Sequence, residues 1–218
     1  MSSATLYRLC GLALLLSVPI GLLGHVVVHP PGHTLETMAG ERWVPAHSLI
    51  LAQALLLLLG LPGLYARVAR CAGWVGLVGF VLMFLGTTSG VSTMVYEVFV
   101  IPVLVADPTY QPLLLPGGPV VGGPLGVYQL AVGGIIFALG SIALGLATIR
   151  GGALPRSAGI ALVLTGLPFL VLRVPVPLPV LLLGLVTFCV AFAWPGWALF
   201  RTQKAVAQAS SAPVRSPA

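Results

Sequence analysis

Histidines are the residues of this chain best suited to binding chemistry, and all four of them lie between Gly24 and Gln53. His25 and His29 are four residues apart, which places both on one face of a helix. The loop that follows is short enough to bring His47, in the next apolar run, to a similar depth. Imidazoles from two adjacent helices can bind haem iron axially, and three imidazoles with a carboxylate can bind zinc or copper. The candidate ligands for haem or a transition metal are therefore His25, His29, His47 and Glu41.

The same segment can instead be a polar layer that binds no ligand. It contains neither an H-E-x-x-H nor a C-x-x-C motif, and His33 follows a double proline in a loop. Histidine and tryptophan rings are common at the boundary between membrane and water, where one end of the ring is apolar and the other wet. We assign Gln53, His33 and Glu36 to this outer polar layer. A third interpretation is proton sensing, because the C-terminal end of a helix favours a protonated histidine.

One carboxylate lies inside an apolar run. Glu97 occurs in the segment V-S-T-M-V-Y-E-V-F-V-I-P. A carboxylate at membrane depth is costly and marks a functional candidate whose partner must be identified. Two partners are open for Glu97, namely Arg173 and the histidine cluster. The alternative is that Glu97 lies just above the hydrocarbon at a helix end, where water solvates it.

Composition decides the class of protein. Of the 218 residues, 58% are hydrophobic and 6% are charged, and the mean hydropathy is +1.10. A soluble domain has about 25% charged residues, so we expect an all-α integral membrane protein whose solvent is the lipid bilayer. The net charge of +6 comes from basic residues scattered at helix ends rather than along one stripe. We therefore expect no nucleic-acid partner.

Apolar runs of 18 or more residues predict membrane-spanning helices, because about 20 residues cross the hydrocarbon core. The sequence predicts one transmembrane domain over residues 1–201 with about six such helices, at residues 6–28, 46–66, 72–97, 127–149, 157–172 and 176–200. The third apolar run is too long for one straight crossing, so we expect either a break or tilt near residues 87–90 or an end that protrudes near Glu97 and is closed by Pro102. Residues 106–125 predict an outer loop rich in proline and glycine, either lying on the membrane or re-entering it. Residues 202–218 predict a disordered tail.

The positive-inside rule gives the orientation. With both termini in the cytoplasm, only Arg42 and Arg173 lie on the outer side. The other basic residues lie on the inner side and are Arg8, Arg67, Arg70, Arg150, Arg156, Arg201, Lys204 and Arg215. The same orientation places every histidine and acidic residue at or near the outer face. We expect a plasma membrane of the bacterial inner-membrane type.

Three functions remain open at this point. The first is a small transporter, permease-like protein or accessory membrane subunit. The second is a redox protein that binds haem or a metal through the outer histidines. The third is a structural or assembly subunit, either in a larger membrane complex or as a homo-oligomer. An oxidase or hydroxylase needs more ligands than one histidine-rich cap supplies, so we do not expect an enzyme. The glycine patterns, such as Gly140 to Gly145, indicate close helix packing rather than a substrate site.

Overall fold

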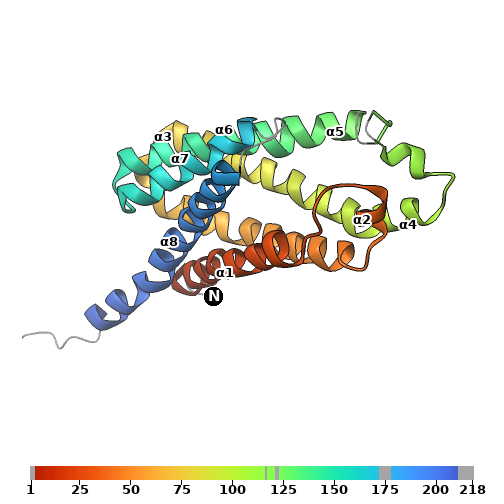
Figure 1. Cartoon of the computed structure of the whole chain (residues 1–218). Helices are drawn as coiled ribbons and strands as arrows, with labels where there is room; N and C mark the ends of the chain where they lie inside the picture. The colour runs from red at the N-terminus through yellow and green to blue at the C-terminus, as the bar shows by residue number, and fades with distance from the viewer. Residues whose placement is uncertain (1–2, 116, 121–122, 172–177, 211–218) are drawn as a thin grey trace, which may run out of the picture.

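The computed structural model describes residues 3–115, 117–120, 123–171 and 178–210 (Figure 1). It is 87% helical, and the described residues contain no strand, which confirms the all-α class. Four helical segments are long and apolar enough to cross a membrane: Ala4–Val28, Trp43–Ala106, Pro124–Gly151 and Leu183–Arg201. A shorter apolar segment covers Arg156–Leu167. Length and hydropathy therefore support a membrane protein.

The N-terminal helix changes its hydrogen-bonding pattern before it ends. α1 (Ser3–Leu22) continues as the π-helix η1 (Leu23–Val28). The amide of His29 donates to the carbonyl of Gly24 five residues earlier, at 3.0 Å. His29 is then extended, as the following proline requires. The helix ends where the sequence predicted, but its last turn is wider than an α-helix, a distortion that often occurs at functional sites.

α3 (Trp43–Phe99) is a helical hairpin of 57 residues with a sharp turn at Gly73. Gly73 has φ 55° and ψ −158°, a backbone conformation that side chains with a Cβ strongly disfavour. The two arms, residues 43–72 and 74–99, pack side by side, since Tyr65 stacks on Phe80 with ring centroids 4.7 Å apart. At the open end, the indole Nε1 of Trp43 donates to the backbone carbonyl of Glu97 at 3.1 Å.

The third predicted helix has no break near residues 87–90. Its helix continues to Phe99, and a separate short helix, α4 (Ile101–Ala106), follows. The hydroxyls of Thr87 and Thr88 donate to carbonyls four residues earlier, at 2.8 and 2.9 Å, within an intact helix. The helix that follows Gly73 therefore continues past Glu97 to Phe99, and the protrusion of this end from the membrane stays a prediction.

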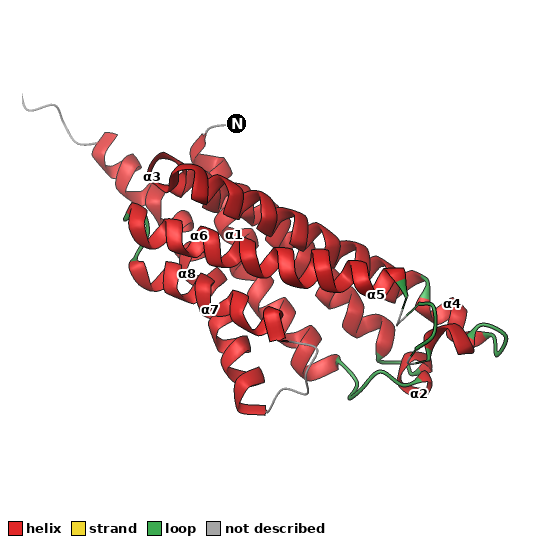
Figure 2. Ribbon diagram, turned by 90° about the horizontal axis from the view of Figure 1, so that it is seen from above, coloured by secondary structure: helices red, strands yellow, loops and turns green. Residues whose placement is uncertain are grey.

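A small cap covers one end of the bundle (Figure 2). It contains α2 (Leu35–Ala39), α4 and the 3-10 helix η2 (Gln111–Leu114). Together with the start of α3, these helices bury a separate apolar cluster made of Met38, Trp43, Ile101, Val105 and Leu114. The predicted loop at 106–125 thus contributes one short helix to the cap, and α5 (Pro124–Tyr128) begins before that range ends.

The remaining helices close a ring with α1 and α3. α5 leads into the π-helix η3 (Gln129–Ile136), followed by α6 (Phe137–Gly151), α7 (Arg156–Val171) and α8 (Leu178–Ser210). Contacts run from α1 to α3, then to α6, α7 and α8, and back to α1. α8 continues to Ser210, so the disordered tail predicted from residue 202 begins too early. Alanine, lysine and glutamine are frequent there, and all three favour helix. The rest of that tail, residues 211–218, lies outside the described residues.

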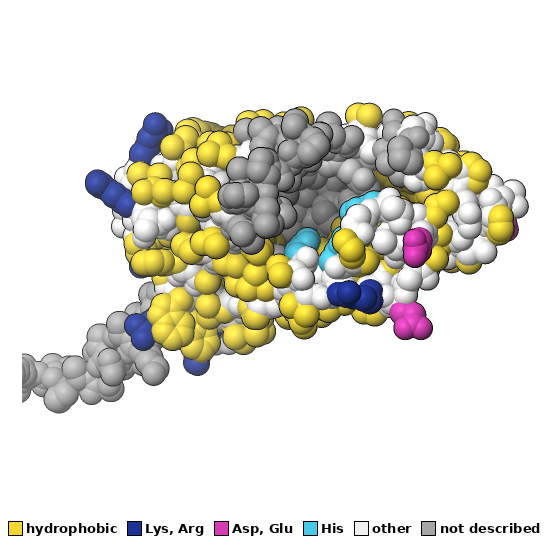
Figure 3. Space-filling view, viewed as in Figure 1, with side chains coloured by type: hydrophobic (Ala, Val, Ile, Leu, Met, Phe, Trp, Pro, Cys, Tyr) yellow, Lys and Arg dark blue, Asp and Glu magenta, His cyan; other side chains and the backbone are white. Residues whose placement is uncertain are grey.

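Charged side chains separate toward the two ends of the molecule (Figure 3). Arginines gather at the end where α1 meets α8, and Arg8 lies 5.3 Å from the ring centroid of Phe200. The acidic side chains lie toward the other end, at the cap, and the histidines lie between the two ends. Arg42, directly before α3, lies at the cap as well. We call the two ends the arginine end and the cap end.

Glycine contacts between helices give the first test of this fold. Gly140 in α6 lies directly against the backbone of Met83 in α3. Gly140→Ala should lower the free energy of unfolding by about 1 to 3 kcal/mol, because the new methyl group meets rigid backbone. Gly90→Ala is the control, since no atom lies within 4 Å of a Cβ at that position, and it should stay within about 1 kcal/mol of wild type. Thermal unfolding in detergent, followed by circular dichroism, measures both. Equal stability of the two variants would contradict the packing of α6 on α3.

Candidate metal centre

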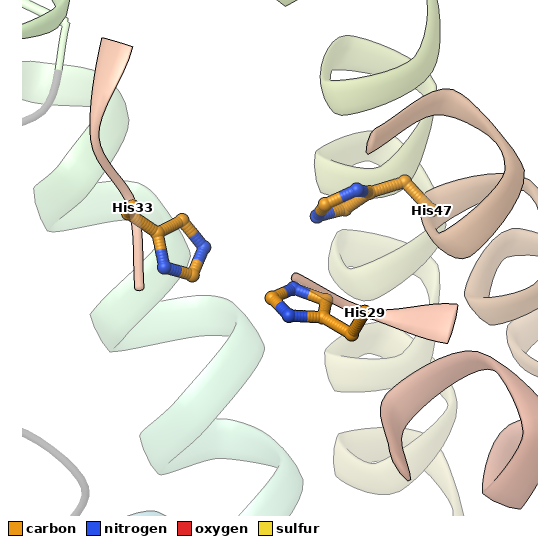
Figure 4. A group of neighbouring side chains, drawn as sticks. All are labelled: His29, His33 and His47. Carbon is orange, nitrogen blue, oxygen red and sulfur yellow. The ribbon is translucent and has the colours of Figure 1, made fainter. Parts of the chain in front are cut away.

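Three histidine side chains converge near the cap end (Figure 4). One nitrogen from each of His29, His33 and His47 lies within 4.8 Å of the other two. The ring centroids of His29 and His47 are 5.0 Å apart, and those of His29 and His33 are 5.6 Å apart. His47 comes from α3, whereas His29 and His33 come from the segment between η1 and α2.

Small residues allow η1 to approach α3 closely enough for His29 to reach His47. A Cβ on Gly24 would lie 3.0 Å from the Ile50 side chain and 3.1 Å from that of Leu49. One turn earlier, Gly21 lies directly against the side-chain amide of Gln53. Both glycines face the first arm of α3, so a larger residue at either position would push the two helices apart.

A tight turn returns His33 to the same place. Gly32 has φ +79°, a left-handed conformation that favours glycine. Thr34 then caps α2, because its hydroxyl accepts from the Thr37 amide at 3.2 Å while the Thr37 hydroxyl accepts from the Thr34 amide at 2.9 Å. Arg42 donates to the carbonyl of Val27 and so ties the end of η1 to the start of α3. These contacts fix both ends of the loop that carries His33.

Backbone carbonyls select the tautomer of two of the imidazoles. Nδ1 of His29 lies 2.7 Å from the carbonyl oxygen of Pro30, and Nδ1 of His47 lies 2.8 Å from that of Trp43. A carbonyl oxygen only accepts, so each Nδ1 carries the hydrogen. In the neutral ring the lone pair is then on Nε2. This is the arrangement of metal-binding histidines, whose second nitrogen donates to a carbonyl or carboxylate.

The fully buried Trp43 forms one wall of the cluster. Its ring centroid lies 4.2 Å from that of His47 and 5.3 Å from that of His33, against which it packs edge-on. His47 is also buried, His29 is half-buried, and the side chain of His33 remains partly exposed. The cluster is therefore rigid on the side of α3 and open to the surface on the side of the loop.

The predicted site residues divide into those that the fold brings together and those that it does not. His29 and His47 meet, as expected, but the third imidazole of the group is His33, which the sequence placed only in the polar layer. Glu36 and Glu41 are exposed, and neither belongs to the group. His25 is exposed and forms a hydrogen bond with the side chain of the buried Gln53. The motif P-P-G-H-T-x-x-T predicts a turn followed by a helix cap, and this turn could have indicated that the chain reverses at His33.

Glu97 lies at the cap end of α3, near Trp43 but outside the histidine group. Its side chain is half-buried, and within the described part of the chain its Oε2 has no hydrogen-bond partner. Arg173, the partner that the sequence suggested, lies outside the described residues. The polar pair of Glu97 and Arg173 therefore remains a prediction.

The geometry of the rings suits a small ion better than haem. A haem bound by two histidines needs its macrocycle between the two rings. His29 and His47 are in mutual ring contact instead, and Trp43 and His33 occupy the adjacent space. Zinc and copper both accept imidazole nitrogen, and three protein ligands leave a fourth position for water.

Comparisons with known proteins give no match for this chain, neither to a family model, nor to a curated protein, nor to a solved structure. The chemistry of the site therefore follows from its own geometry.

The protonation of His33 tests the cluster. Partial burial of its ring, followed by the charge of His29, lowers the pKa of His33 below its ordinary value of 6.5. NMR titration of protein labelled with ¹³C-histidine should give a His33 midpoint below 6.5. The unfolded chain binds this proton more readily than the folded protein does. The lowered pKa of His33 therefore leaves the free energy of unfolding unchanged well above pH 6.5 and decreases it as the pH falls through 6.5.

His29→Asn should raise that midpoint toward 6.5, because it removes the neighbouring charge while keeping a side-chain NH near the Pro30 carbonyl. His33→Ala identifies the resonance. A midpoint at or above 6.5 in the wild-type protein would show that the His33 ring does not face His29 in solution.

Proposed function

We propose that this protein is a multi-pass membrane protein that binds a transition-metal ion through His29, His33 and His47. The observation that carries the proposal is the convergence of three ring nitrogens within 4.8 Å, with Nδ1 of two of the rings already bonded to backbone carbonyls. Ligands that are held in place before the ion arrives lose little conformational entropy when it binds. Zinc and copper are the ions whose preferences this donor set matches.

Access to the site supports an ion that exchanges with the surroundings. His33 is partly exposed, and histidine side chains are visible at the surface of the face drawn in Figure 3. A structural zinc site, by contrast, normally has four protein ligands and no open position. We therefore propose that the ion is a cargo or an exchangeable ligand, as in a small metal permease or the metal-binding subunit of a larger membrane complex.

The proposal also includes the side of the membrane on which the metal site lies. The turn of α3 at Gly73 gives two arms, each longer than the about 20 residues of one crossing. If each arm and α7 are counted as one crossing, the total equals the six crossings that the sequence predicts, and both termini would lie on the same side. Arginines at the arginine end then favour the cytoplasm for that end. The metal site would lie at the outer face of a plasma membrane.

Metal titration tests the proposed function. Protein purified in mild detergent and stripped with a chelator should bind one Zn²⁺ per chain in isothermal titration calorimetry. His47→Asn should weaken binding at least about tenfold, which corresponds to about 1.4 kcal/mol. Asparagine keeps an NH near the position of Nδ1, so the bond to the Trp43 carbonyl is preserved while the ligand nitrogen Nε2 is lost.

The control is the double variant Glu36→Gln, Glu41→Gln, which removes the exposed carboxylates of the cap. It should bind Zn²⁺ as wild type does, because neither carboxylate belongs to the histidine group. If wild-type protein and His47→Asn took up Zn²⁺ identically, the three histidines would not be ligands and the proposal would be wrong. A loss confined to the double glutamine variant would instead make Glu41 a ligand.

A further inference from the structure

Two arginines at the arginine end lie over aromatic rings of α8. The guanidinium carbon of Arg8, in α1, is 5.3 Å from the ring centroid of Phe200. The guanidinium carbon of Arg201, in α8 itself, is 4.4 Å from the ring centroid of Trp197. The rings of Trp197 and Phe200 stack on each other, with their centroids 6.4 Å apart and an angle of 16° between their planes. One pair of stacked rings therefore carries two positive charges, which come from two different helices.

A close contact between two backbones holds α1 and α8 together beside these rings. A Cβ on Gly11 would lie 2.6 Å from the carbonyl oxygen of Gly196, and a Cβ on Gly196 would lie 3.0 Å from that of Gly11. Gly11 is three residues after Arg8, and Gly196 directly precedes Trp197. Leu199 is fully buried in the main apolar core. The aromatic pair and both arginines are thus attached to a tightly packed helix junction.

Neither guanidinium has an acidic side chain as its partner. The four acidic residues of the chain lie in or next to the helices of the cap end, at Glu36, Glu41, Glu97 and Asp107. Among the described residues, the arginine that donates a hydrogen bond is Arg42, also at the cap end. A guanidinium has five N–H donors. The N–H groups of Arg8 and Arg201 are therefore available to an anion from outside the chain.

An exposed apolar strip runs along the helix from each of the two arginines. On α1, exposed Leu12 and Leu16 follow Arg8 at intervals of four residues. On α8, the exposed residues that lead away from Arg201 at helical spacing are Trp197, Trp194 and Val190. Residues three or four apart lie on one face of a helix, so each arginine is at the end of an apolar surface. Tryptophan rings favour the depth of lipid head groups, which places the two guanidiniums at that depth.

We propose that Arg8 and Arg201 together bind the phosphate of an anionic phospholipid, whose acyl chains cover the two exposed strips. Guanidinium groups bind phosphate through paired N–H donors, and contact with the rings orients both groups before the lipid arrives. A phospholipid matches the surface better than a free phosphate ion does, because the donors and the apolar strips are adjacent on the same two helices. Basic groups at the ends of membrane helices bind anionic head groups in this way. The inference requires that lipid surrounds the chain, and it is independent of the metal site.

Native mass spectrometry of the full chain in detergent tests the site by titration with phosphatidylglycerol, with phosphatidylcholine as the uncharged reference. The test variant is Arg8→Gln, Arg201→Gln, which removes both charges and keeps an amide N–H on each side chain. The control variant is Arg150→Gln, Arg156→Gln, which removes two charges at the connection between α6 and α7. In the described structure these two arginines are exposed, and neither lies over an aromatic ring. All four changes are on exposed side chains, so both variants should fold, and size-exclusion chromatography checks this.

The wild-type chain should bind phosphatidylglycerol at least about tenfold more tightly than phosphatidylcholine, because each arginine near an anionic lipid surface contributes about fivefold. The test variant should lose this preference, whereas the control variant should lose less than about threefold, since its charges lie away from the site and are screened. Glycerol phosphate, which is the head group without acyl chains, should not displace the lipid when added in excess. Zn²⁺ binding by the test variant should match that of wild type, because the histidines lie closer to the cap end.

Three outcomes would overturn the inference. Equal losses in the two double variants would mean that the net charge of the arginine end attracts the lipid, without a site at Arg8 and Arg201. Unchanged binding in the test variant would mean that neither arginine contacts the phosphate. Displacement by glycerol phosphate would mean that the two arginines bind a small anion without the acyl chains. Failure of the wild-type protein to bind Zn²⁺ would instead overturn the proposed function and leave the lipid site standing.

Discussion

The hydrogen bond from the Trp43 indole to the Glu97 carbonyl joins the two ends of a helical hairpin 57 residues long. The bond lies at the open end of α3, opposite the turn at Gly73, so it determines where the second arm ends relative to the first. The same indole is fully buried and packs on the rings of His47 and His33. Hairpin closure and the position of the imidazoles therefore depend on one side chain.

Electrostatics explains why several imidazoles can share so small a space. Protonated rings would repel one another, and a membrane boundary adds a cost for each charge. Donation from Nδ1 to the carbonyls of Pro30 and Trp43 is compatible with neutral rings, and the lowered pKa of His33 acts in the same direction. A cluster of neutral nitrogen donors is what a metal cation needs, because each ligand must be deprotonated before it binds.

Close packing between apolar helices places these groups with few side-chain hydrogen bonds between helices in the described part of the bundle; one is the Ser141 hydroxyl of α6, which donates to the Leu162 carbonyl of α7 at 2.6 Å. Gly11 against Gly196, Gly79 against Leu144 and Gly145 against Gly159 bring neighbouring backbones together. Buried hydroxyls, such as those of Thr87 and Thr148, mostly donate to carbonyls of their own helix. The histidine group and the described acidic side chains, by contrast, lie toward the cap end.

The sequence by itself determined the helical membrane class and the end of the molecule at which the chemistry lies. Both follow from hydropathy and from the crowding of all four histidines into one segment, which are local properties of the chain. Two of the three converging histidines, His29 and His47, were among the candidate ligands that the sequence indicated. Only the tertiary structure decided that His33 joins them, because the left-handed turn at Gly32 and the cap at Thr34 reverse a loop whose path no periodicity predicts. The tertiary structure also decided that α3 continues past Thr87. Packing of its second arm against the first stabilises a helix whose end the sequence alone does not define.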